Sequence, residues 1–160
     1  MSASSAMRTS QQKHTPSRAC RDAYLRLIQP EIMAWGLQQH PNPASYFGGS
    51  DFGYQWDWAD YTDTSAIKLA TFAILNPGQQ LWIGGLRLSH FEGMVTDLPI
   101  LDDTMGGIFR LQRRWSIRQP LTGLIFSFRQ TRSQSIDDAA EHLMMEVINE
   151  FPKLRRYLYG

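Results

Sequence analysis

Carboxylates and aromatic rings share one short stretch of this chain, GYQWDWADYTD at residues 53–63. Core strands seldom carry several acids and solvated loops seldom carry tryptophans. The stretch therefore combines aromatic residues typical of a core with carboxylates that could bind a ligand or take part in catalysis. Asp60 and Asp63 follow the alternating part and are the carboxylates best placed to attract a cation or accept a proton. We therefore take both as candidate catalytic residues at the rim of a pocket.

A second pattern that could do chemistry lies further along, in WIGGLRLS at residues 82–89. Gly84 and Gly85 stand inside an apolar run, where glycine usually marks a bulge or a close approach of another group to the backbone. Arg87 can bind a ligand carboxylate or hold Asp60 and Asp63 in place. The plainer interpretation is an ordinary hairpin with a surface ion pair.

Arginines are concentrated in the second half of the chain. The cluster consists of Arg110, Arg113, Arg114, Arg118, Arg129 and Arg132. On a helix the first four would share a face, and beside aromatic side chains they could bind phosphates or single-stranded nucleic acid. The alternative is that they pair with aspartates earlier in the chain. The formal net charge of +1 favours this alternative, so nucleic acid is not an expected partner.

The histidines and the cysteine suggest structural roles. Asp138, His142 and Glu146 are spaced four residues apart, but they lie on the polar side of an amphipathic helix, where such a ladder is simply solvated. We therefore expect no metal site. Cys20, the single cysteine, falls on an apolar helix face and is expected in the core. No nucleotide-binding or serine-hydrolase motif occurs.

The bulk properties predict a globular protein in a reducing compartment. The chain has 160 residues, of which 42% are apolar and 19% charged. Its start is polar, and no run of about 18 apolar residues is present. We expect a cytoplasmic protein without membrane association, with a disordered tail over residues 1–16 and a single domain over 17–160.

Periodicity predicts the elements that must position these residues. A helix is expected from Pro16, with Pro30 either interrupting it or opening a second helix. Residues 52–59 alternate as a strand that turns away at Asp60, and residues 66–75 and 81–89 form a hairpin. Residues 121–129 are a further strand, and residues 108–118 fit either period.

The last predicted element is an amphipathic helix that begins after Ser135 and is interrupted at Pro152. The order of elements predicts an α+β fold. A central, mostly antiparallel sheet would carry an N-terminal helix pair and the long C-terminal helix, because each amphipathic helix must cover an apolar sheet face.

Together these patterns resemble the GNAT acyltransferases and, within them, the N-acylhomoserine lactone synthases of quorum sensing. DYTDTSAIKLATFAI places Asp60 and Asp63 on the two aspartates of that family, and GGLRLS places Arg87 on its arginine. RRWSIR offers Trp115 and Arg118 for a later strand, with Ser116 where the family has a glutamate. Trp35 matches a tryptophan that lines the substrate pocket.

The resemblance implies a GNAT-like fold and an acyl transfer from a carrier thioester to the amine of S-adenosylmethionine. The acyl donor would be an acyl carrier protein or acyl-CoA, and no cofactor would be bound permanently. Asp60 and Asp63 would attract the sulfonium substrate, while Arg87 and Arg118 would hold those acids in place. The implied substrate-binding residues are Trp35, Trp115, Gly84 and Gly85.

The competing hypothesis is a non-catalytic α+β module of the immunity or adaptor type. Its aromatic-acidic strand at residues 52–60 would contact a protein partner, because exposed tryptophan and tyrosine beside aspartate suit an interface hot spot. The two hypotheses differ in one geometric respect. The enzyme needs Asp60, Asp63 and Arg87 around a common hollow, whereas the binding module needs the aromatic rings on the surface.

Overall fold

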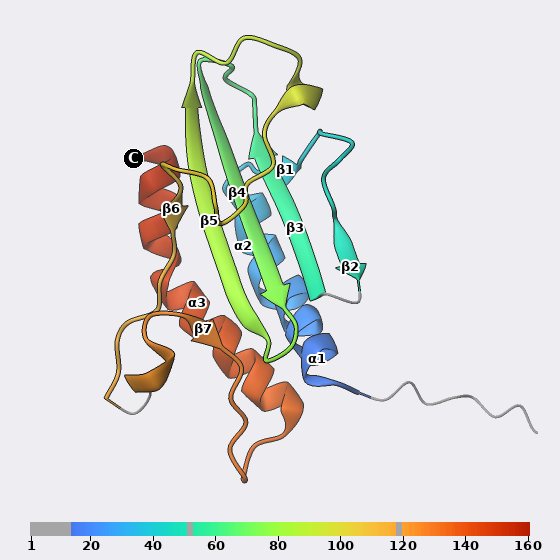
Figure 1. The fold of residues 1–160 in the computed structure, drawn as a ribbon, viewed down its shortest axis with the longest axis vertical. Coiled ribbons are helices and arrows are strands. Elements are labelled where there is room, and N and C mark those ends of the chain that lie inside the picture. The colour runs from blue at the N-terminus through green and yellow to red at the C-terminus, as the bar shows by residue number, and fades with distance from the viewer. Residues whose placement is uncertain (1–13, 51–52, 118–119) are drawn as a thin grey trace, which may run out of the picture.

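The N-terminal helical region covers one face of a sheet (Figure 1). The computed structural model describes residues 14–50, 53–117 and 120–160. α1 (Pro16–Ala23) begins as predicted, with the Thr15 hydroxyl accepting a hydrogen bond from the Arg18 N–H. The chain then passes through a π-helical turn, Tyr24–Ile28, into α2 (Gln29–Ala34). Of the two alternatives for Pro30, the structure has the second: Pro30 lies in the first turn of α2, where its missing N–H costs least, and α2 follows the π-helical turn without a break.

The sheet is antiparallel in every described pairing. Its centre is formed by β3 (Gly53–Asp60), β4 (Ala66–Leu75) and β5 (Gln80–Ser89), so the predicted strand and hairpin are confirmed. The short strands β1 (Gln38–Gln39) and β2 (Gly48–Ser50) pair with β3. On the other side, β6 (Phe109–Arg110) and β7 (Phe126–Ser127) pair with β5. The α+β class with a mostly antiparallel sheet is confirmed.

Two regions are less regular than predicted. The strand expected over 121–129 is reduced to β7, and a 3₁₀ turn, Pro120–Thr122, precedes it. Residues 108–117 form only β6 and then an extended segment, so the arginines there do not share a helix face. Proline and glycine in this region break both periods.

The tryptophans of the acidic stretch belong to the core. Trp56 and Trp58 are each 3% exposed and face the helices. The Tyr24 ring stacks on Trp56 with centroids 3.8 Å apart, and Trp58 Nε1 donates to the Tyr24 hydroxyl at 2.9 Å. The expected aromatic surface on this strand is therefore wrong for its tryptophans, because the alternating rings bury against α1 and the π turn. The expectation for Phe52 lies outside the described residues.

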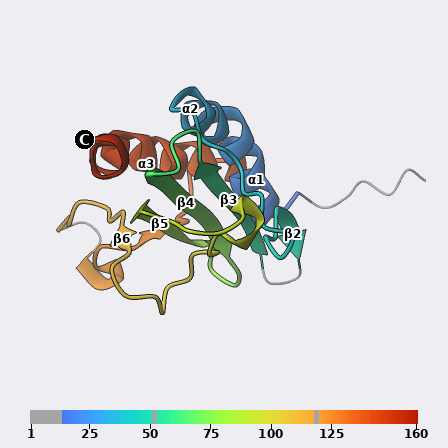
Figure 2. The same cartoon turned by 90° about the horizontal axis from the view of Figure 1, so that it is seen from above.

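The opposite face of the sheet is covered by the segment after β5 rather than by a helix (Figure 2). A smaller apolar cluster forms there, in which Leu98 and Leu101 pack on the sheet residues Ile67 and Leu69. A short 3₁₀ helix, Val95–Asp97, lies within this segment. The sheet thus has two apolar faces of unequal size, and only the larger one is helical.

A buried carboxylate joins this second face to the loop before β2. Asp57 is fully buried and accepts hydrogen bonds from Ser45 Oγ, Gln55 Nε2 and Thr71 Oγ1 at 2.8–3.0 Å. Its backbone carbonyl accepts from the His40 N–H. These donors satisfy the charge, so Asp57 acts as a cross-link within the fold.

α3 (Ile136–Tyr159) is longer than predicted. Ser135 Oγ caps it by accepting from the Asp138 N–H at 3.0 Å, as expected. Pro152 does not end it, although a proline inside a helix costs about 3 kcal/mol. Leu154 and Leu158, beyond the proline, are buried against the sheet, and this burial offsets the cost.

The two glycines of β5 lie in an unbroken ladder, so the expected bulge is wrong. Gly84 pairs with Thr71 and Gly85 with Ala70 in continuous register. The alternative expectation of a close approach is confirmed, but the approaching group is the protein's own helix. A Cβ on Gly85 would lie 2.7 Å from Leu154 Cδ1. The glycine therefore lets α3 pack directly on β5.

We predict that Gly85→Ala destabilises the protein by about 1–3 kcal/mol, because the added methyl overpacks a filled contact. Urea unfolding followed by tryptophan fluorescence measures the loss. Gly106→Ala is the matched control, since a Cβ there meets nothing within 4 Å. The double variant Gly85→Ala/Leu154→Ala should lose less free energy of unfolding than the two single variants lose together, because the truncation makes room for the methyl. Full additivity would contradict this explanation.

Candidate functional site

Three charged side chains lie in one row across the sheet, at the end where α3 finishes. Asp60 on β3 pairs with Lys68 on β4, and Lys68 pairs with Arg87 on β5. Directly paired residues of antiparallel strands share a face, so all three are on the helix-covered side. Neighbouring strands are about 4.8 Å apart, which places the Cα atoms of Asp60 and Arg87 roughly 10 Å from each other. The structure therefore brings two of the expected catalytic residues onto one face.

The Asp60 carboxylate is already engaged by protein groups. It is 6% exposed, and its Oδ2 accepts from the Tyr159 hydroxyl at 2.9 Å. Its Oδ1 accepts from the Thr62 N–H at 3.2 Å and the Thr62 hydroxyl at 2.7 Å. Burial alone would raise the pKa of Asp60, but the bonds from Thr62 and Tyr159 and the charge of Lys68 outweigh it and lower the pKa. Asp60 is thus held as a carboxylate that fastens the last turn of α3 to the sheet.

Tyr159 is the other half of this contact. Burial and the neighbouring Asp60 carboxylate both raise the pKa of its phenol, so the hydroxyl stays protonated and donates. Lys68 Nζ lies 5.3 Å from the centre of the Tyr159 ring, within cation–π range. Lys68 was not among the predicted site residues. The hairpin register would have found it, because the turn at residues 76–79 fixes Lys68 opposite Arg87.

The remaining predicted residues divide between the two ends of the molecule. Asp63 is exposed, and its Oδ1 accepts from the Ser65 N–H and hydroxyl, a local turn that lowers its pKa. The Trp35 ring packs on Phe151, and its Nε1 donates to Glu31. The next residue, Gly36, lies close to Asp60: a Cβ built on it would be 3.6 Å from Asp60 Oδ2. Trp115 lies far away on an exposed loop, and Arg118 lies outside the described residues.

The glycines predicted to bind substrate are covered by the protein itself. Side chains of Trp82 and Ile108 lie against Gly84, and Leu154 lies against Gly85. No metal-binding group of three or more His, Cys, Asp or Glu side chains occurs in the described part of the chain. His142 and Glu146 instead form an ion pair at 3.3 Å. Cys20 is fully buried, which raises the pKa of its thiol to about 12 and leaves it unreactive.

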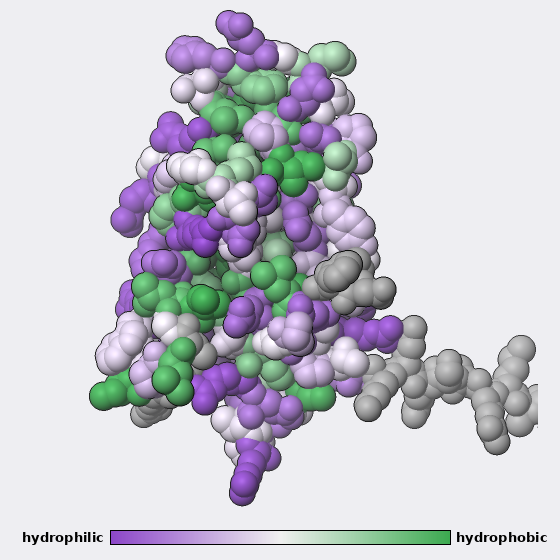
Figure 3. Space-filling view, in the orientation of Figure 1, coloured by the Kyte–Doolittle hydropathy of each residue, from purple (hydrophilic) through white to green (hydrophobic). Residues whose placement is uncertain are grey.

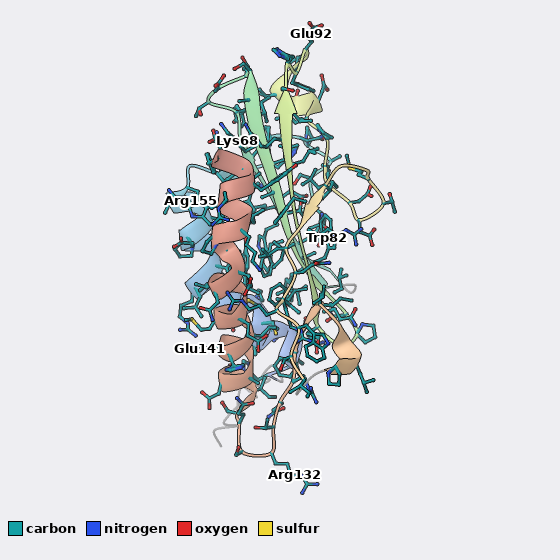
Figure 4. All side chains as sticks on the ribbon, turned by 90° about the vertical axis from the view of Figure 1, so that its left-hand side faces the viewer. Lys68, Trp82, Glu92, Arg132, Glu141 and Arg155 are labelled. Carbon is teal, nitrogen blue, oxygen red and sulfur yellow. The ribbon has the colours of Figure 1, made fainter. Side chains whose placement is uncertain are left out.

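A cleft of about 850 Å³ opens at the other end of the molecule, between α3 and the segment that precedes it. We call it the arginine groove. Its charged lining consists of Arg113, Arg114, Arg129, Arg132, His142, Glu146 and Glu150. Figure 4 shows how far this is from the charged row: Arg132 lies at one tip of the molecule, whereas Lys68 lies beside the opposite end of α3. Sequence patterns identified the arginines but not their arrangement.

The groove is built around a buried acid. Glu150 is 4% exposed, and its Oε1 lies 2.9 Å from Arg114 Nε, while Lys153 Nζ approaches its Oε2. Arg114 thus pairs with an acid on α3 rather than with an aspartate from earlier in the chain. Sequence analysis missed Glu150. Its position in the apolar stripe between Val147 and Leu154 was the available signal, because an acid at a core position needs a cation.

Arg113 braces the loop that borders the groove. Its side chain is buried and donates to the carbonyls of Arg114, Gly123 and Ile125 at 2.5–3.2 Å. Its own N–H donates to the Leu124 carbonyl. One guanidinium, with five donors in a rigid fork, therefore cross-links both ends of this loop.

The braced loop exposes large apolar side chains. Five of them are 40–100% exposed: Trp115, Ile117, Leu121, Leu124 and Ile125. We call the described residues on either side of positions 118–119, namely 115–117 and 120–125, the apolar loop. Figure 3 shows apolar surface gathered at the lower left, over this loop. The sequence predicts a strand over 121–129 and leaves residues 108–118 open between helix and strand, whereas the proline and glycine at positions 120 and 123 indicate turns.

We predict that Tyr159→Phe lowers the free energy of unfolding by about 1–2 kcal/mol at neutral pH, because it leaves the Asp60 carboxylate short of one donor. Since the folded pKa of Asp60 lies below its unfolded value, the contribution is present above that unfolded value and is lost as the pH falls through the folded one. The difference from wild type should therefore shrink below about pH 4.

Tyr157→Phe is the control for this prediction. Its ring stacks on Phe109, and no hydrogen bond of its hydroxyl is found among the described residues. Urea unfolding between pH 3 and pH 7 makes the comparison. An equal loss in both variants, or a loss that does not change with pH, would show that the bond to Asp60 is not responsible.

No helix in the described residues has the length and apolar character needed to cross a membrane. Comparisons of the chain with family models, with curated proteins and with solved structures give no match. What the protein does must therefore be inferred from its own side chains and their arrangement.

Proposed function

We propose that this protein is a non-catalytic binding module that recognises a protein partner through the apolar loop and the arginine groove beside it. The observation that carries the proposal is the exposure of five large apolar side chains on a loop that Arg113 holds in place. Scattered apolar residues on a surface are ordinary, but a group gathered on one braced loop is typical of interaction sites.

The free energy available at such a loop is substantial. Burying apolar surface contributes about 25 cal/mol per Å². Trp115 and the neighbouring arginines are also the residue types that dominate interface energetics. The exposed apolar area and the residue types therefore both favour recognition of a protein surface.

The binding surface differs from the one expected on the acidic-aromatic strand. Trp56 and Trp58 are core residues, so their rings are not offered to a partner. Tyr54 is half-buried and stacks on Trp56. We therefore assign the partner surface to the apolar loop, at the end of the molecule away from Asp60.

A random-peptide library displayed on phage tests this function with the intact protein as bait. We predict that enriched peptides bind wild type and lose at least tenfold in affinity to the Ile117→Ser/Leu121→Ser variant, since about 1.4 kcal/mol corresponds to tenfold. Both side chains are exposed, so the variant keeps its core. Met94→Ser, which changes another exposed apolar side chain outside the apolar loop, should bind like wild type. Failure to enrich peptides, or equal binding to the loop variant, would overturn the proposal.

A second candidate is the acyltransferase acting on S-adenosylmethionine. It is favoured by the ionised Asp60, the exposed Arg87 in the same row and Trp35 nearby. Against it, the Asp60 carboxylate is already bonded to Tyr159 and Thr62, and Leu154 fills the space beside Gly85. The binding module is therefore the preferred function.

Thermal unfolding with S-adenosylmethionine separates the two candidates. A ligand at one hundred times its Kd stabilises a protein by about 2.7 kcal/mol, which raises Tm by several degrees. We predict no shift at millimolar ligand. A shift that Asp60→Asn abolishes, measured against that variant's own Tm, would instead favour the acyltransferase.

A further inference from the structure

The arginine groove has the dimensions of an extended peptide segment. Its α3 wall runs from Ala139 to Glu150, which at about 1.5 Å per residue is roughly 16 Å. An extended chain advances about 3.3 Å per residue, so about five residues fit along this wall. The opposite wall is the segment around Ser127 to Arg132.

The charge of the groove calls for an anionic occupant. Four arginines line it against two glutamates, and Glu150 is already paired with Arg114 and approached by Lys153. Arg129 and Arg132 are exposed, and neither forms an ion pair with any residue in the described ranges. These two guanidinium groups are available to a ligand, and their planar forks match carboxylates.

The groove favours acidic peptide over nucleic acid. Single-stranded nucleic acid needs exposed rings on which bases stack, whereas the aromatic side chain that lines the groove, Phe126, is 1% exposed. Leu143 adds apolar lining, and Asn149 and Gln130 add amides, which suit peptide side chains and backbone.

One residue of the β7 wall presents its backbone away from the sheet. Ser127 lies opposite Gln80, and Phe128, one residue further, donates its N–H to the Gln79 carbonyl. Hydrogen-bonded pairs alternate along antiparallel strands, so the N–H and C=O of Ser127 point away from β5. Ser127 also lines the groove. An added strand could therefore pair with it, as in peptide recognition by strand addition.

We infer that the arginine groove binds an extended acidic segment of the partner, whose carboxylates contact Arg129 and Arg132 and whose backbone pairs with Ser127. The inference rests on the proposed function and names the chemistry of the partner. The apolar loop supplies the anchor, and the groove selects segments with acidic side chains on alternate residues, because alternate side chains of a strand share a face.

The test measures binding of a fluorescein-labelled octapeptide that alternates glutamate and threonine, by fluorescence anisotropy at low and high salt. We predict that wild type binds it, that Arg129→Gln/Arg132→Gln weakens binding at least tenfold, and that salt weakens it further. Arg155→Gln/Arg156→Gln is the matched control: it removes the same charge from exposed positions near the end of α3, outside the groove lining, and should bind like wild type.

The peptide itself supplies the remaining controls. An octapeptide with lysine in place of glutamate should not bind, and N-methylation at its central residues should weaken the acidic peptide, because it removes donors needed for pairing with Ser127. No binding of the acidic peptide, equal weakening by both arginine pairs, or tighter binding of a single-stranded oligonucleotide would overturn the inference.

Failure of this inference is distinguishable from failure of the proposed function. If displayed peptides require Ile117 and Leu121 but bind the Arg129→Gln/Arg132→Gln variant normally, the binding module stands and the acidic segment is wrong. If the acidic octapeptide binds through Arg129 and Arg132 while the library yields nothing that depends on the apolar loop, the groove stands and the loop is not the anchor.

Discussion

The contact between α3 and β5 determines where every other feature of the molecule lies. Gly85 has no side chain, and Leu154 of α3 occupies the space above it. Leu158, one turn later, is also buried and lies near Gly85, so the helix packs on the strand beyond Pro152. Because α3 is held at this point, its last turn reaches Asp60 and its N-terminal part, from Ala139 to Glu150, forms a wall of the arginine groove. A larger residue at position 85 would displace both ends together.

The two polar regions along α3 differ in whether their charges are satisfied within the protein. Near the C-terminal end, the carboxylate of Asp60 accepts from Tyr159 and Thr62, and the charge of Lys68 lies close by. At the groove, Glu150 is paired from two sides, yet Arg129 remains exposed without an ion pair in the described chain. Unsatisfied charge is what a ligand can exploit, whereas a satisfied network has to be broken before it can bind anything.

The sequence identified the regular elements because their periodicity is strong. The alternation in β3, the apolar runs of β4 and β5 and the helical stripe from Ile136 to Phe151 each repeat over several residues. The candidate site was harder, because it depends on register and on irregular segments. Asp60 and Arg87 share a face through pairing with Lys68, but which chemical groups surround Asp60 depends on the position of Tyr159, 99 residues away in sequence. A local sequence pattern does not indicate a contact between residues so far apart in the chain.

The irregular segment before α3 has no periodic sequence pattern, yet its two ends are joined by hydrogen bonds from one side chain. Its backbone groups have no ladder to join, so a buried arginine supplies the donors: Arg113 bonds to carbonyls on both sides of the 3₁₀ turn. Burying a guanidinium is costly unless its donors are satisfied, and the loop carbonyls satisfy those of Arg113. Gly123, Leu124 and Ile125 are thereby held next to Arg114. Because these carbonyls are satisfied by Arg113, the exposed side chains of Leu124 and Ile125 are what this part of the loop offers to a partner, and covering them removes apolar surface from water without leaving those polar groups unpaired.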